Sequence, residues 1–159
     1  GEIGHAALGL NNRMCECGRL GCVQATISEP ALMHEARKVE PSIDMEGLSA
    51  AFSAGTPWAR RLLRMTAENI LSVLSLLANA YAPDAIILCG SMIDRCAALR
   101  ELISQAFLEE QARFLNPTFA LGFSQFGPDG NIIGAATVAF NYDIDNRVVA
   151  YSQQNQAEA

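Results

Sequence analysis

Four side chains that can bind a metal ion lie close together at the start of the chain. They are His5, Cys15, Cys17 and Cys22, in the pattern H-x9-C-x-C-x4-C. Zinc favours four tetrahedral ligands, and three cysteines with one histidine are a common structural set. Because four protein ligands leave no open coordination position, the spacing predicts a structural zinc site rather than a hydrolytic one.

Two glycines in this segment support a metal-binding loop. Gly18 and Gly21 allow the backbone to reverse through left-handed conformations and to return the last cysteine to the same ion. The alternative is a set of ordinary buried thiols beside a surface imidazole. An odd total of five cysteines and the lack of a signal segment favour metal over disulfides. Cys89 and Cys96 are expected to be small core residues. His34 is expected to be an ordinary solvated histidine.

Glu2 lies three residues before His5, and two interpretations of this pair remain open. A metal-bound imidazole uses one ring nitrogen and leaves the other N–H free to donate a hydrogen bond. The carboxylate can accept that bond and orient the ring. Alternatively, the two side chains can hold a polyol, with the carboxylate accepting from hydroxyl groups and the imidazole donating to one.

The composition limits the class of protein. The chain has 159 residues, half of them apolar, which is enough for one ordinary domain with a real core. Its net charge of −6 argues against nucleic-acid binding by these residues alone. The densest apolar stretch, residues 69–81, is too short to span a bilayer. We therefore expect a soluble cytoplasmic protein with no membrane contact.

The order of predicted helices and strands indicates an α/β fold. Cap signals predict helices over residues 29–38, 45–54, 57–81, 94–110 and 132–140. Apolar runs predict strands over 85–89 and 118–126, the first covered on both faces. A turn is expected at 127–130, and a polar, disordered tail at the end. Two strands do not make a stable sheet, so this is expected to be part of a larger domain.

The motif Gly1-Glu-Ile-Gly-His5, followed by Cys15-Glu-Cys-Gly-Arg-Leu-Gly-Cys22, resembles the signature of the ROK family of repressors, open reading frames and sugar kinases. The resemblance continues to about residue 140. It implies the C-terminal part of an actin-like ATPase (ribonuclease-H-like) fold with a structural zinc loop, in a homodimer or tetramer. We expect a zinc loop with the sugar motif over 1–25, an α/β lobe over 26–150 and the tail over 151–159.

The resemblance also implies roles for individual residues. His5, Cys15, Cys17 and Cys22 match the family's zinc ligands. Glu2 and His5 match its sugar-contacting pair, for a sugar or sugar phosphate. Gln24 stands where the family has a third sugar contact, a glutamate, so it keeps hydrogen-bonding ability but loses the charge. The family's phosphate-binding loop and catalytic aspartate precede this motif. We therefore expect a C-terminal fragment that phosphorylates nothing by itself.

Three function classes remain. Kinases of the family have a glycine-rich turn near the nucleotide where this chain has Gly90, Ser91 and Met92, and the two bulkier residues hinder backbone approach. Together with Gln24 and an extension after Phe140, this favours a sugar-sensing and oligomerisation part of a repressor. DNA would then be bound only through a domain outside these residues. A kinase, with ATP and Mg²⁺ at Gly90 and Ser91, is the second interpretation. A docking module with a decayed site is the third.

Overall fold

The computed structural model describes residues 2–10, 12–113 and 119–157. It divides into two compact units, residues 1–123 and 124–159. The first unit contains the His/Cys segment, six helices and both strands. None of the described helices is long and apolar enough to cross a bilayer.

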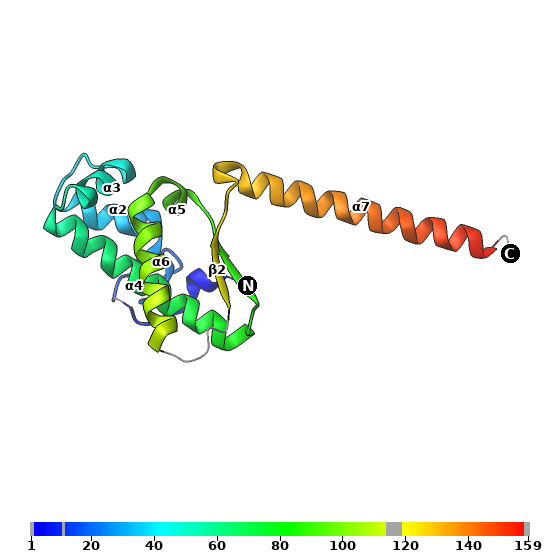
Figure 1. Cartoon of the computed structure of the whole chain (residues 1–159), viewed down its shortest axis with the longest axis horizontal. Coiled ribbons are helices and arrows are strands. Elements are labelled where there is room, and N and C mark those ends of the chain that lie inside the picture. The colour runs from blue at the N-terminus through cyan, green and yellow to red at the C-terminus, as the bar shows by residue number, and fades with distance from the viewer. Residues whose placement is uncertain (1, 11, 114–118, 158–159) are drawn as a thin grey trace. The chain divides into compact units, whose positions relative to one another are not determined.

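The first unit is mainly a layer of helices (Figure 1). The short 3-10 helix η1 covers Ile3–His5. The α-helices are α1 (Gln24–Ile27), α2 (Glu29–Arg37), α3 (Met45–Ser53), α4 (Pro57–Tyr81), α5 (Ser91–Arg95) and α6 (Ala97–Arg113). In Figure 1, α6 crosses α4, the longest helix of this unit, and the two pack together.

The predicted helix starts are confirmed by their caps. The Ser28 side chain accepts a hydrogen bond from the backbone N–H of Ala31, and Asp44 accepts one from Gly47. Pro57 occupies the first turn of α4. The expected helix over 94–110 differs, because the structure has two helices, α5 and α6, separated at Cys96, whose φ is −119° and ψ is 85°.

Helix α4 organises the core. One of its faces carries the buried residues Ala59, Leu63, Thr66, Ala67, Ile70, Leu71, Val73, Leu74 and Ala78. This spacing of three and four residues is that of a helix with one face in a core. Leu32 from α2, Leu48 from α3 and Leu99 from α6 are at most 1% exposed and belong to the same cluster. Cys96 is buried as predicted.

The strands β1 (Ala85–Leu88) and β2 (Ala120–Phe123) pair in parallel, with Ile86 opposite Leu121 and Leu88 opposite Phe123. These four side chains pack against the helical core. The prediction that the first strand is covered on both faces is wrong, since Ile87 on the other face is 59% exposed.

Cys89, which follows β1, is exposed, so its expected place in the core is also wrong. Both errors have one physical reason, because an apolar run does not reveal how many layers cover it. The second strand was expected from residue 118, which lies outside the described residues.

The second unit consists of the 3-10 helix η2 (Gly127–Asp129) and helix α7 (Gly130–Ala157). The turn expected at 127–130 is η2. The expected helix over 132–140 is only the first part of α7, and the tail expected to be disordered from residue 151 is helical through Ala157. After Gly134 the chain has no glycine or proline that would end a helix. The two compact units meet after Phe123. The boundaries at 25 and 150 stay a prediction.

Candidate functional site

The His/Cys segment is a loop that folds back on itself. Antiparallel bridges pair Ala7 with Cys22 and Met14 with Leu20. The backbone N–H of Val23 donates to the Ala6 carbonyl at 2.9 Å. These contacts bring the two ends of the loop side by side, which places η1 next to the last cysteine.

Left-handed glycines make the reversal, as the sequence predicts. Gly18 has φ 83° and Gly21 has φ 75°. The N–H of Gly18 donates to the Cys15 carbonyl at 2.8 Å, closing the turn that carries the Cys-x-Cys pair. A side chain at either glycine would strain this conformation.

The loop gathers the four predicted metal ligands. One ligand atom from each of His5, Cys15, Cys17 and Cys22 lies within 4.8 Å of all the others. Cys15 Sγ is 3.7 Å from His5 Nδ1, and Cys17 Sγ is 3.6 Å from Cys22 Sγ. Cys15 and Cys22 are buried, whereas Cys17 is exposed.

This donor set fits a zinc ion. A tetrahedral site with the usual zinc–sulfur and zinc–nitrogen bond lengths has ligand atoms about 3.5–3.8 Å apart. The two close pairs already have this separation. The widest separation of 4.8 Å requires a contraction of about 1 Å. The cluster can therefore hold a metal with four protein ligands.

The metal-free thiols differ in acidity. The backbone and then the side chain of Arg19 lower the pKa of Cys17 from 9.0 to about 6. Burial, followed by hydrogen bonds with the other two thiols, raises the pKa of Cys22 from 9.0 to about 11. Three clustered thiols do not all lose their protons unless a cation compensates the negative charges. A metal ion can supply that compensation, and its binding is then coupled to the folding of the loop.

The second ring nitrogen of His5 points toward Glu2. Its Nε2 atom is 3.6 Å from Glu2 Oε2, an ion-pair distance rather than a hydrogen bond. The Glu2 side chain is 84% exposed, so it can still accept from hydroxyl groups. Both residues line a pocket of about 630 Å³ with Arg19, Leu77 and Tyr81. The two roles considered for this pair are thus compatible with each other.

Gln24 lies beside this motif at the start of α1. An added Cβ on Gly4 would lie 3.5 Å from Gln24 Cβ and from its Oε1 atom. The η1 turn, which carries His5, therefore packs against the Gln24 side chain. Gln24 therefore lies next to the turn that carries Glu2 and His5, although it is not among the residues that line their pocket.

Gly90 and Ser91 are on a different set of elements, where β1 ends and α5 begins. Gly90 has φ 116°, a conformation that favours glycine. The Ser91 hydroxyl donates to Glu29 Oε2 at 2.5 Å. Arg95 donates to Glu29 at 3.1 Å and to both oxygens of Glu46 at 2.8 and 2.9 Å. This ion-pair cluster ties the Gly90 turn to α2 and α3.

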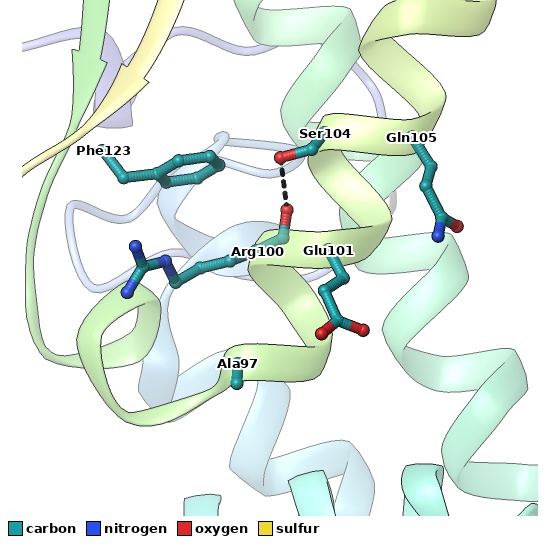
Figure 2. Close-up of a pocket in the computed structure, with 6 residues that line it drawn as sticks. All are labelled: Ala97, Arg100, Glu101, Ser104, Gln105 and Phe123. Atoms are coloured by element: carbon teal, nitrogen blue, oxygen red, sulfur yellow. Dashed lines mark hydrogen bonds between the residues drawn. The ribbon is translucent and has the colours of Figure 1, made fainter.

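A further pocket of about 440 Å³ lies between α6 and β2. Figure 2 shows Arg100 extending under the ring of Phe123, with the guanidinium carbon 5.2 Å from the ring centre. Ser104 donates to the Arg100 backbone carbonyl at 2.9 Å, while Glu101 and Gln105 point away from the ring. The guanidinium of Arg100 is thus engaged with Phe123 by a cation–π contact.

The fold and the site together define an α/β protein with a His/Cys loop that could hold a metal ion, beside a pocket with both charged and apolar residues. A model of the ROK family matches residues 1–141, and the chain belongs to this family. Among curated proteins, it is 24% identical over 139 residues to N-acetylmannosamine kinase of Salmonella arizonae, covering 87% of this chain and 46% of that protein. It is 29% identical over 90 residues to kanosamine kinase of Amycolatopsis mediterranei, covering 56% of this chain and 30% of that protein.

Solved structures of the family share the fold. A ROK hexokinase from Thermus thermophilus matches with TM-score 0.77 and 26% identity over 91% of this chain and 49% of that one. A Streptomyces griseus ROK glucokinase, in complex with glucose and AMPPNP, gives TM-score 0.72 and 24% identity, over 86% and 50%. A ROK transcriptional regulator, a homologue of the E. coli MLC protein, gives 0.60 and 23%, over 77% and 34%. The chain thus spans about half the length of these relatives or less.

The structure adds three residues to the candidate site that sequence reasoning did not select. Arg19 is inside the Cys-rich motif, two residues after Cys17, so its place in the sequence could have predicted that it lies near the cluster. Leu77 and Tyr81 come from the last turns of α4, far along the chain, and reach the pocket of Glu2 and His5 only through the fold. No pattern in the sequence connects them to that motif.

Proposed function

We propose that this chain is the sugar-binding and oligomerisation part of a ROK-type transcriptional regulator, with zinc holding the loop of residues 1–25. One observation carries the proposal. His5 lies between two features, with Nδ1 in the cysteine cluster and Nε2 toward Glu2 in an open pocket. A metal on one side of the ring would therefore fix the orientation of a sugar contact on the other.

Zinc would be held by His5, Cys15, Cys17 and Cys22, and would supply a closed structural crosslink rather than a Lewis acid. Glu2 would accept from sugar hydroxyl groups and His5 Nε2 would donate to one. Gln24 would contribute a neutral amide in place of the family's third carboxylate. Exposed aromatic rings commonly pack on the apolar faces of ligands, and Tyr81, 76% exposed, is placed to do so.

Two features favour a regulator over an enzyme. Gln24 cannot supply the negative charge that the family's kinases place there. At the proposed nucleotide position, Ser91 is held by Glu29, and Met92 is packed against the core. A phosphate group approaching this turn would also meet an ion-pair cluster in which the two carboxylates of Glu29 and Glu46 outnumber the single guanidinium of Arg95, so the net charge there repels anions.

The second candidate is the C-terminal half of an ATP-dependent sugar kinase. It is supported by the relatives, because the N-acetylmannosamine, kanosamine and hexose kinases all match this chain. In that case ATP and Mg²⁺ would bind near Gly90 and Ser91. Phosphoryl transfer needs a base and phosphate-positioning groups, and these would come from residues outside the 159.

In the regulator, sugar binding would act through a conformational equilibrium. A sugar or sugar phosphate that prefers one arrangement of the two lobes of a family member shifts the population toward it. DNA-binding domains attached outside these residues would then change their spacing, and a homo-oligomer would present two of them. Replacing Cys17 with serine should loosen the loop and uncouple sugar binding from regulation.

The test uses the longest natural protein that carries this chain. Sugar binding is measured by calorimetry with hexoses and N-acetylhexosamines, and ATP turnover is measured on the same sample. A regulator binds a sugar without turnover, and Glu2→Gln weakens that binding at least tenfold, as expected for a lost charged hydrogen bond. Glu16→Gln, on the same loop, is the matched control and should bind normally.

Turnover with any sugar would replace the regulator with the kinase. No binding of any sugar would refute both and leave a docking module. Zinc content is measured separately by mass spectrometry under native conditions, since its absence would refute the role of the loop without deciding between regulator and kinase.

A further inference from the structure

A second pocket in the first unit lies outside the sugar motif and the metal cluster. It is an open groove of about 600 Å³ between the start of the chain, α2 and α4. We call it the Trp58 groove and define it by Leu10, Val39, Trp58, Arg61, Leu62 and Met65.

Helix α4 presents three different faces along its first half. One face, containing Ala59 and Leu63, is buried in the core. A second, with Trp58, Leu62 and Met65 at intervals of four and three residues, lines the Trp58 groove. Trp58 and Leu62 are half-buried and also pack against the core cluster, whereas Met65 is exposed. The core therefore uses this second apolar stripe only in part.

The apolar lining is accessible from outside. Met65 is 48% exposed and Val39 is 57% exposed. Large apolar side chains that gather in a concave, open surface mark interaction sites more often than isolated exposed ones do. The groove offers an unbranched side chain (Met65), a branched one (Leu62) and an aromatic one (Trp58). Such a mixed apolar surface suits the aliphatic side chains of a partner.

The margin of the groove is positively charged. Arg60, Arg61 and Arg64 form the third face of α4 and line an adjoining pocket that shares Arg61 and Met65 with the Trp58 groove. In the part of the chain that the structure describes, Arg61 and Arg64 have no carboxylate within ion-pair distance.

The carboxylates near this margin offset its positive charge only in part. Glu35, which also lines the groove, is already engaged by Lys38 at 2.8 Å and by Arg13 at 3.1 Å. Glu68 is the only other carboxylate among the residues that line the two pockets. Three arginines within five residues, on a chain of net charge −6, therefore form a localised exception to its acidic surface.

The charge pattern selects among possible occupants. A second copy related by a two-fold axis would bring the same basic margin to both sides of the contact. The carboxylates it could offer from this surface are Glu35, already paired with Lys38 and Arg13, and Glu68. Nucleic acid would use the arginines but leave the aliphatic lining without a partner, and the acidic chain would repel it. An amphipathic segment with both acidic and aliphatic side chains satisfies both halves of the surface.

We propose that the Trp58 groove is a docking site for an acidic amphipathic segment of a partner protein. Aliphatic side chains of that segment would pack between Trp58, Leu62 and Met65, and its carboxylates would pair with Arg61 and Arg64. The site is independent of the proposed function, because it includes neither Glu2 nor His5 and requires no sugar.

The full 159-residue chain is tested with a fluorescein-labelled helical peptide of about 18 residues built from Leu, Ala and Glu, without Trp. Trp58 is the only tryptophan of the chain, so its emission reports directly on the groove. We expect saturable anisotropy and a blue shift of Trp58 emission. We also expect the affinity to fall when salt rises from roughly 0.05 to 0.5 M.

The double variant Arg61→Gln, Arg64→Gln should weaken binding roughly tenfold, since two exposed ion pairs are lost. The single variant Arg64→Gln should show the same sign with a smaller change. Arg147→Gln is the matched control. It removes one exposed arginine, 79% exposed and paired with Asp143, from the other unit, and should bind as the original chain does.

Three outcomes would overturn the proposal. The first is equal binding of the peptide with Gln or Lys in place of Glu, or of a single-stranded oligonucleotide of similar length. The second is absence of binding. The third is a dimer, by sedimentation, that the double variant converts to monomer, because the groove would then be an interface between copies of this chain.

Discussion

The His/Cys loop and the helical layer of the first unit are stabilised by different means. In the layer, apolar side chains from α2, α3, α4 and α6 form one continuous buried cluster. In the loop, residues 2–23 bury only a few side chains, Cys15, Cys22 and Val23 among them, and depend on backbone bridges and glycine turns. A short segment without its own apolar core needs a crosslink to stay ordered.

This difference implies that the two regions should respond to different perturbations. Loss of a ligand side chain should loosen the loop and leave the layer folded. Loss of a core methyl group should destabilise the layer without changing metal content.

The largest effect is expected from metal removal. Structural zinc contributes on the order of 10 kcal/mol to ordering its ligands, so a chelator or Cys17→Ser should abolish the order of residues 2–23. Hydrogen exchange should show the loop amides losing protection while those of α4 keep theirs. Cys89→Ser, an exposed cysteine outside the cluster, should change neither. Melting of α4 together with the loop would show that the contrast is false.

A smaller effect, about 2–5 kcal/mol of unfolding free energy, is expected for Leu63→Ala. Leu63 is fully buried in the layer, so truncation leaves a cavity. Urea denaturation measures this loss, and metal content should not change. Met65→Ala, two residues along the same helix but 48% exposed, should cost much less. Equal losses for the two variants would contradict the buried and exposed faces assigned to α4.

The smallest effect concerns acid. Arg95 lowers the pKa of Glu46 from 4.5 to about 2, mainly through its hydrogen bonds. A carboxyl with a lowered pKa stabilises the fold above its unfolded pKa, and this contribution is lost as the pH falls from about 4.5 toward 2. Glu46→Gln should flatten the pH dependence of the urea midpoint in that range. Glu40→Gln, without an ion pair in the described part of the chain, should retain it; equal slopes in both variants would remove Arg95 as the cause.

Local signals predicted the helices, because a cap is made within a few residues of the sequence. Ser28, Asp44 and Pro57 each start a helix as their residue types indicate. The His/Cys cluster was equally predictable, since Cys15, Cys17 and Cys22 are neighbours in the chain and two glycines fix the turn.

Features that depend on distant segments were not predictable in the same way. The open face of β1 at Ile87 depends on how many elements cover the sheet, and the sequence of the strand is apolar in either case. Tyr81 joins the pocket of Glu2 only because α4 ends there. The break at Cys96 separates α5 from α6 without a proline or glycine. The residue types around it therefore did not predict that the helix ends there.

Helix α4 contributes side chains to both surface pockets, one near each of its ends. Trp58 in its first turn lines the Trp58 groove, and Tyr81 in its last turn lines the pocket of Glu2 and His5. At 1.5 Å per residue, these side chains are attached about 35 Å apart on one hydrogen-bonded rod. A tilt of about 5° at one end displaces the other by about 3 Å. A ligand that tilts α4 at either proposed site would therefore shift the residues of the other.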